Sequence, residues 1–201
     1  MTDTPVMRGP YAKTSQIRAM ILDAALAVFA QNGYRKGSLK SVADAAGMSE
    51  AGLLHHFPSK GALLAGVLER RDTHAREHFT FDPTDGLRLL RDFAELTEFN
   101  ASTPGVVELF CTLSAEATTT DHPAHGYFLT RYTETVGMAR AALEELSERG
   151  ILADGIDPAS AARSIIALMD GLQIQWLMDR SSVDMASEVR QYFDSLVTVE
   201  F

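Results

Sequence analysis

Residues 38–58 constrain the fold of this chain more than any other stretch. Apolar residues recur there at helical spacing, and Gly47 then permits the left-handed backbone that ends a short helix. Ser49 can cap a second helix, which must end by Phe57 because Pro58 disfavours the helical conformation in the residue before it. Two short helices joined at a glycine are typical of a helix-turn-helix, whose second helix lies in the DNA major groove.

The remaining pattern is helical too. Apolar residues at helical spacing follow Thr14 or Ser15 and stop at Gly33, and Ser59 can cap a helix that runs toward His78. No stretch alternates apolar and polar residues as a half-buried strand would. We therefore predict an all-α fold of about nine helices, a small N-terminal bundle followed by a larger one. Five helices of the larger bundle are expected over residues 84–101, 105–119, 123–149, 159–179 and 184–198.

Charge is distributed unevenly along the chain. The formal net charge is -9, yet residues 1–60 favour Lys and Arg over Asp and Glu, and every lysine lies at or before Lys60. This indicates that only the N-terminal part meets a polyanion. Lys60 begins a helix, where free backbone N–H groups favour a phosphate, although a merely solvated lysine is the alternative. Lys40 is a second candidate for a phosphate contact.

Composition narrows the classes of protein further. Cys111 is the single cysteine among 201 residues, so no internal disulfide is possible, and the first residues lack the pattern of a signal peptide. No apolar run approaches the roughly 20 residues of a membrane-spanning helix. We therefore expect a cytoplasmic protein with no membrane contact. No motif for catalysis is present, so we expect neither an enzyme nor a bound cofactor.

The N-terminal third resembles the DNA-binding domain of the TetR (tetracycline-repressor) family. The resemblance runs from Ile17 through Leu64 and implies a helix-turn-helix DNA-binding domain over residues 1–60. It also implies a ligand-binding and dimerisation domain over residues 61–201. The matching positions are Phe29, Gly33, Val42-Ala43, Ala46-Gly47-Met48-Ser49 and His55-His56-Phe57-Pro58-Ser59-Lys60.

The resemblance implies which residues contact DNA. Residues 38–47 form the supporting helix of the helix-turn-helix, residues 49–56 enter the major groove, and Lys60 contacts the phosphate backbone of the DNA. Leu54 stands where the family commonly has a tyrosine, and it cannot donate a hydrogen bond to phosphate. It either touches a thymine methyl group or packs inward. The predicted DNA-binding residues are Ser38, Lys40, Ser49, Glu50, Ala51, Gly52, Leu54, His55 and Lys60.

The resemblance also implies a homodimeric repressor that a small-molecule effector releases from its operator. The effector would bind in a cavity of the larger domain. The last two helices carry more apolar residues than one buried face requires, so we expect them to pair with a second copy, unless they simply close the monomer core. Candidate pocket residues, each of which fits an ordinary core or surface role as well, are Phe93, Phe110, Cys111, Glu116, Tyr132, Met138, Met169, Gln173 and Trp176.

His74 and His78 carry the alternative hypothesis, a helical metal-binding protein or enzyme. At i and i+4 they share a helix face, but Ala75 occupies the position of the glutamate found in zinc hydrolases, so no metal is predicted. His55 and His56 point about 100 degrees apart and are expected to lie outward and partly packed, respectively. The cysteine is expected in the core or a pocket wall, with a thiol redox sensor as the alternative.

Overall fold

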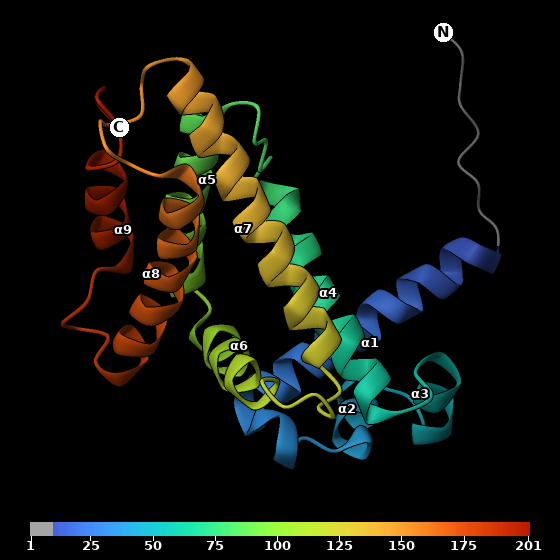
Figure 1. Cartoon of the computed structure of the whole chain (residues 1–201). Helices are drawn as coiled ribbons and strands as arrows, with labels where there is room; N and C mark the ends of the chain where they lie inside the picture. The colour runs from blue at the N-terminus through green and yellow to red at the C-terminus, as the bar shows by residue number, and fades with distance from the viewer. Residues whose placement is uncertain (1–9) are drawn as a thin grey trace, which may run out of the picture. The chain divides into compact units, whose positions relative to one another are not determined.

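The computed structural model of the protein describes residues 10–201, with side chains from Thr14 onward. In this range the chain forms nine α-helices (Figure 1). Its contacts divide the chain into an N-terminal unit that ends at Arg71 and a C-terminal unit, Asp72–Phe201. The helices are α1 (Pro10–Lys36), α2 (Leu39–Ala45), α3 (Glu50–His56), α4 (Lys60–His78), α5 (Gly86–Ala101), α6 (Pro104–Glu116), α7 (His125–Glu148), α8 (Pro158–Met178) and α9 (Met185–Asp194).

The division between the two units falls inside α4. The first part of α4 packs against other helices of the N-terminal unit. A Cβ atom on Gly66 would lie 2.8 Å from Leu22 and 3.0 Å from Phe57. Arg70 Nε lies 3.0 Å from Asp23 Oδ1 on α1. The break before Lys60 therefore marks the start of a helix rather than the end of a unit.

Serine caps set the starts of the two short helices, as predicted. Ser38 Oγ accepts a hydrogen bond from Ser41 N at 3.0 Å, and Ser41 Oγ accepts one from Ser38 N at 2.9 Å. Ser49 Oγ caps α3 by accepting from Gly52 N at 3.1 Å. Gly47 between the helices has φ +65°, which a glycine adopts without strain. A Cβ at Gly52 would lie 3.2 Å from Ser49 Oγ, so this glycine also leaves room for the cap.

The first helix begins earlier than its predicted cap. The expected start at Thr14 or Ser15 is wrong, because α1 begins at Pro10 and both residues lie within it. Proline is favoured in a first helical turn, where its missing N–H leaves no hydrogen bond unmade. The predicted stop at Gly33 is confirmed as an interruption, with φ 74° and ψ 157°, before the helical assignment continues to Lys36.

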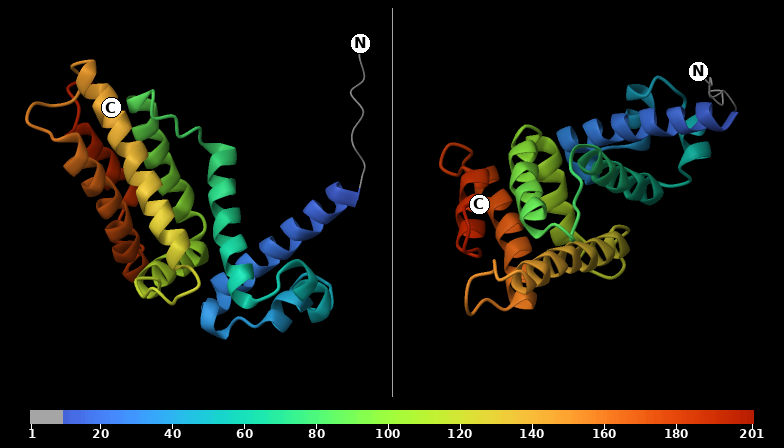
Figure 2. Two further views of the ribbon diagram at one scale, coloured as in Figure 1. Left: turned by 45° about the vertical axis from the view of Figure 1, so that its right-hand side comes forward. Right: turned by 90° about the horizontal axis from the view of Figure 1, so that it is seen from above.

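In the C-terminal unit, α5, α7, α8 and α9 lie side by side and α6 lies at one end of them, as Figures 1 and 2 show. α7 packs on α8, and α5 packs on both α7 and α9. Among the described residues, none of the helices combines the length and apolar character needed to cross a membrane. The core between these helices includes Leu89, Leu90, Phe93, Leu143, Leu146, Ile165, Val189 and Phe193.

The chain leaves α9 at Asp194, four residues before the predicted end. Leu196 and Val197 are nevertheless buried, because the segment turns back over the connection between α7 and α8. Leu196 O accepts from Ala153 N at 2.9 Å, and Thr198 N donates to Ile151 O at 2.8 Å. This short antiparallel contact ties the C-terminal segment to a loop more than 40 residues earlier.

Candidate nucleic-acid interface and ligand cavity

One face of α3 is exposed, and its residues are those expected to read DNA. Leu53 is fully buried and holds the helix to the unit, whereas Leu54 is 37% exposed. Leu54 therefore does not pack inward, and that alternative is wrong. His55 is exposed and His56 half-buried, as predicted. The exposed positions from residue 49 to residue 55 are Ser49, Glu50, Ala51, Leu54 and His55.

Arg18 on α1 holds the C-terminal end of α3. Its Nη1 atom donates to His56 O at 2.6 Å, and its guanidinium lies 4.1 Å from the centroid of the Phe57 ring. A cation at the end of a helix complements the partial negative charge of its last carbonyl groups. Arg18 is thus a positioning residue for α3. Sequence reasoning missed this role because 38 positions separate the two partners.

Lys60 is half-buried against the end of α1. Its Nζ atom donates to Arg35 O at 3.2 Å and lies 4.5 Å from the centroid of the Tyr34 ring. Desolvation by burial lowers the pKa of the Lys60 ammonium below its ordinary value. Lys60 is therefore more than solvated surface, and the two remaining N–H groups of the ammonium are the ones left for a phosphate. Lys40 and Ser38, by contrast, are exposed.

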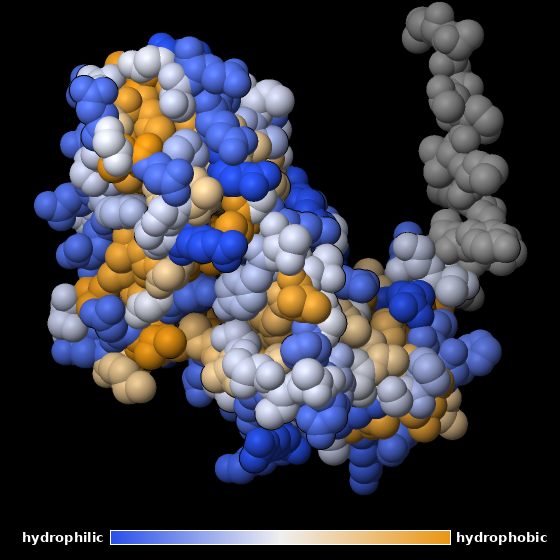
Figure 3. Space-filling model, viewed as in Figure 1, coloured by the Kyte–Doolittle hydropathy of each residue, from blue (hydrophilic) through white to orange (hydrophobic). Residues whose placement is uncertain are grey.

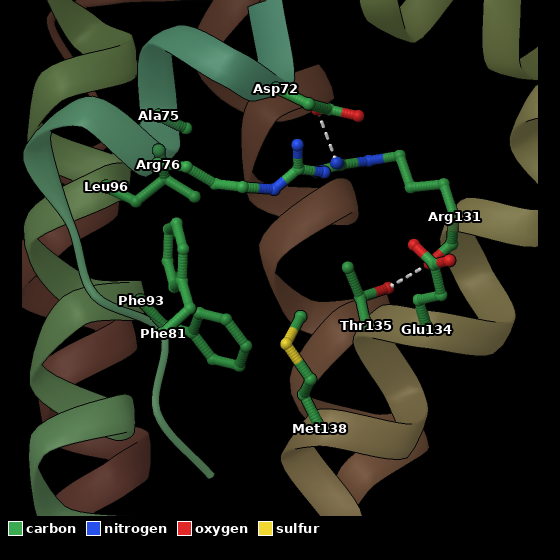
Figure 4. A pocket seen from close by; sticks show the side chains of 10 residues that line it. All are labelled: Asp72, Ala75, Arg76, Phe81, Phe93, Leu96, Arg131, Glu134, Thr135 and Met138. Carbon is green, nitrogen blue, oxygen red and sulfur yellow. Dashed lines mark hydrogen bonds and ion pairs between the residues drawn. The ribbon is translucent and has the colours of Figure 1, made fainter. Parts of the chain in front are cut away.

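A cavity of about 60 Å³ lies between α4, α5 and α7 of the C-terminal unit (Figure 4). One side of the cavity is apolar, and the centroids of the Phe81 and Phe93 rings there lie 5.9 Å apart. The other side is charged, with guanidinium groups from α4 and α7 beside a carboxylate from α4. Its lining residues are Asp72, Ala75, Arg76, Phe81, Phe93, Leu96, Arg131, Glu134, Thr135 and Met138.

The carboxylate of Asp72 joins α4 to α7. Asp72 is 8% exposed, and its oxygens accept from Arg131 Nη1 at 2.5 Å and from the Tyr127 hydroxyl at 2.7 Å. Sequence reasoning missed this group. The available signal was position, because Asp72 continues the i, i+4 series of buried Leu64 and Leu68, where a charge is unexpected.

Phe81 is held in the cavity wall by a second buried carboxylate. The backbone at Phe81 has φ 50°, a conformation that costs free energy for a residue other than glycine. Asp92 is fully buried, and its Oδ2 atom accepts from Phe81 N at 3.0 Å. Within the described part of the chain its Oδ1 atom makes no hydrogen bond, and its charge is balanced by Arg88 Nη2, 2.7 Å away. The connection between α4 and α5 is thus fastened to α5.

The predicted pocket residues are distributed over several places. Phe93 and Met138 line the cavity between α4, α5 and α7. Cys111 lines a second, more open cavity of about 420 Å³ with Ile174 and Met178 on α8. The other candidates line neither cavity. Phe110 and Tyr132 pack near Phe128, and the Tyr132 hydroxyl donates to Asp170. Buried Gln173 accepts a hydrogen bond from the Cys111 thiol, and Glu116 faces His122. Met169 and Trp176 belong to the core.

The two histidines of the pair on α4 each contact another group of the same helix. His74 Nε2 lies 3.9 Å from Glu77 Oε2, and His78 Nδ1 lies 2.8 Å from His74 O, the carbonyl one turn earlier. Within the described residues, no group of three or more His, Cys, Asp or Glu side chains is arranged to hold a metal ion.

Comparisons with known proteins agree with both halves of this description. Residues 21–67 match the family described as bacterial regulatory proteins, tetR family, and residues 84–198 match the BetI-type transcriptional repressor C-terminal family. The HTH-type transcriptional regulator TtgR of Pseudomonas putida is 27% identical over 203 residues, covering 94% of each chain.

Solved structures show the same fold. GusR of Salmonella enterica superposes with a TM-score of 0.71 at 25% identity and covers 92% of this chain and 96% of its own. A TetR-family regulator structure from Rhodococcus sp. has a TM-score of 0.74 at 23% identity and covers 92% and 100%. The second likeness shows the fold alone.

Proposed function

This chain belongs to the TetR family and is a DNA-binding transcriptional regulator, and we propose that it is a homodimeric repressor that a small-molecule effector releases from its operator. The match of separate family descriptions to both parts of the chain carries this proposal. A regulator of this kind acts at the DNA inside the cell, and binding and release of DNA require no chemical reaction.

The DNA-reading role is assigned to the exposed face of α3. Its capped start and its arginine-bound end fix the helix, and a fixed helix presents its side chains to base edges at defined positions. Leu54 offers a thymine methyl group an apolar contact, while His55 and Lys40 offer donors to phosphate. Lys60 completes this set at the start of α4.

Selection of fragments from the protein's own genomic DNA tests this assignment. Binding of an enriched fragment is then measured by fluorescence anisotropy at several salt concentrations. Lys40→Ala should weaken binding to all sequences and reduce the salt slope by about 1. Arg163→Ala, a change at an exposed arginine on α8, serves as the control and should leave binding unchanged. Equal effects of the two changes, or no enriched fragment, would refute the proposal.

Leu54 requires a separate comparison. Leu54→Ala should lower discrimination between operators with and without a thymine at one position, because a methyl contact is lost. Leu54→Tyr restores the residue common in the family and should add a sequence-independent phosphate contact. Identical base preferences for all three proteins would exclude a base contact by this side chain.

The effector role is assigned to the cavity between α4, α5 and α7. α4 carries Arg70, paired with Asp23 in the N-terminal unit, and Asp72, paired with Arg131 in the C-terminal unit. A ligand that favours one position of α4 therefore acts on the helix that both units share. An effector should weaken operator binding without unfolding the protein. Tight effector binding with unchanged operator affinity would contradict this mechanism.

The dimer is assigned to α8 and α9, with α8 supplying the apolar contacts. Ile174 is 49% exposed and Met178 83% exposed, and apolar colours gather at the lower end of α8 in Figure 3. The apolar residues of α9, by contrast, are satisfied within the chain, since Val189 and Phe193 are fully buried. The number of apolar residues on α9 is therefore no argument for a second copy of the chain. The exposed apolar end of α8 is the feature that supports the dimer interface.

A further inference from the structure

We propose that the cavity between α4, α5 and α7 takes a small organic anion, with a carboxylate between Arg76 and Arg131 and an apolar body against Phe81 and Phe93. This inference rests on the effector role proposed above and specifies the chemical class of the ligand.

The charged side of the cavity holds two guanidinium groups that point toward one another (Figure 4). Arg131 uses its Nη1 atom on Asp72, and no hydrogen bond joins its other nitrogens to the described residues. Arg76 is exposed and makes no hydrogen bond or ion pair within the same part of the chain. Two guanidiniums with several unused donors form a fork that matches the two oxygens of a carboxylate.

The acidic groups nearby do not cancel this preference. Asp72 accepts from two donors, Arg131 and the Tyr127 hydroxyl, and is nearly buried, so its charge is directed at groups already bound to it. Glu134 at the edge is exposed, and no ion pair joins it to either arginine in the described residues. A cation in the cavity would face two guanidiniums at close range, whereas an anion would relieve their mutual repulsion.

The apolar side selects the body of the ligand. Phe81, Phe93, Leu96 and Met138 provide aromatic and aliphatic surface on which a ring or a short alkyl chain can pack. The volume of about 60 Å³ admits a carboxylate group in the present arrangement. Met138 has three rotatable bonds and is only half-buried, so its rotation can enlarge the space.

Binding to the full-length protein in the absence of DNA tests the inference. Calorimetry at low salt compares benzoate, phenylacetate and hexanoate with benzamide, phenylacetamide and hexanamide. At least one acid should bind tenfold or more tightly than its own amide, and its affinity should fall as salt is added. If no acid binds more tightly than its amide, the inference is overturned.

Variants locate the binding. Arg76→Gln should weaken binding of the best acid at least tenfold with an unchanged melting temperature, since this exposed side chain has no hydrogen-bond or ion-pair partner among the described residues. Arg76→Lys should recover part of the affinity, because it restores charge but not the fork. Arg140→Gln, on α7 with its guanidinium 3.5 Å from Glu144, is the control and should bind the acid normally. Normal binding by Arg76→Gln would overturn the site.

A parallel operator-binding measurement separates the two proposals. An acid that binds as described but leaves operator affinity unchanged supports this inference and contradicts the effector role. If the neutral amides release the operator and the acids do not, the effector role stands and the anion preference is overturned.

Discussion

Single carboxylates hold the wall of the cavity between α4, α5 and α7 in place. Asp92 and Glu95 both face Arg88, but only Asp92 is buried and bound to the backbone of Phe81. Glu95 Oε2 lies 3.8 Å from the same guanidinium nitrogen, and its side chain is 48% exposed. Substitutions at the two residues therefore distinguish the contribution of a buried carboxylate to the free energy of unfolding from that of an exposed one.

Asp92→Ala should lower the free energy of unfolding by about 3 kcal/mol, because it strands the Phe81 N–H and removes a buried ion-pair partner. Glu95→Ala is the matched control and should cost less than about 1 kcal/mol, as exposed ion pairs do. Urea denaturation measures both values. Equal losses would show that Asp92 does not fasten the connection between α4 and α5.

The environment of the Tyr132 hydroxyl predicts that the stability of the fold falls at alkaline pH. Burial, followed by the 2.7 Å hydrogen bond to Asp170, raises the pKa of the Tyr132 hydroxyl above its ordinary value. The folded state thus favours the protonated phenol, so its stabilisation is complete below about pH 10 and is lost as pH rises further. Tyr132→Phe should be less stable at pH 7, and the difference should shrink above pH 10 in thermal melts. A constant difference would contradict this assignment.

At the scale of helices, α3 depends on a contact from another element. The cap at Ser49 belongs to the sequence next to the helix, but the other end is held by Arg18 from α1. A helix of 7 residues has little stability of its own, so its orientation comes from such contacts and from buried Leu53.

Arg18→Met keeps the apolar stem but removes the donor, and it should cost about 1–2 kcal/mol of stability and weaken operator binding. Arg18→Lys should recover part of both, because an ammonium can donate to His56 O but does not stack as a guanidinium does. Gln16→Met, at an exposed position on the same helix, is the control for the added apolar group. Unchanged operator affinity in Arg18→Met would exclude the positioning role.

Local sequence predicted the helices better than it predicted the cavity. Ser38, Ser49 and Gly47 act through hydrogen bonds and backbone angles within a few residues, so their effect is visible in the sequence. The cavity depends on partners such as Asp72 and Arg131, which 59 positions separate. Apolar spacing identified Phe93 and Met138 but also selected residues that fill the core, because the spacing is the same for both.

At the scale of the whole molecule, the exposed end of α8 makes association testable. Met178→Glu combined with Ile174→Glu should shift the molar mass measured by light scattering from twice 21.9 kDa to 21.9 kDa, because each carboxylate would be desolvated in the interface. Gln191→Glu on the exposed side of α9 tests whether that helix also contributes. A monomeric unmodified protein at micromolar concentration would refute the dimer.

The antiparallel contact between residues 151–153 and 196–198 also governs how the chain end comes apart. The last helix cannot fray from its C-terminal side alone, because release of Leu196 and Val197 would open the core at the same time. An exopeptidase that shortens the chain should therefore slow sharply by Thr198. Digestion that continues smoothly into α9 would show that the contact does not resist opening. The rate of digestion near Thr198 thus measures how readily the core of the C-terminal unit opens.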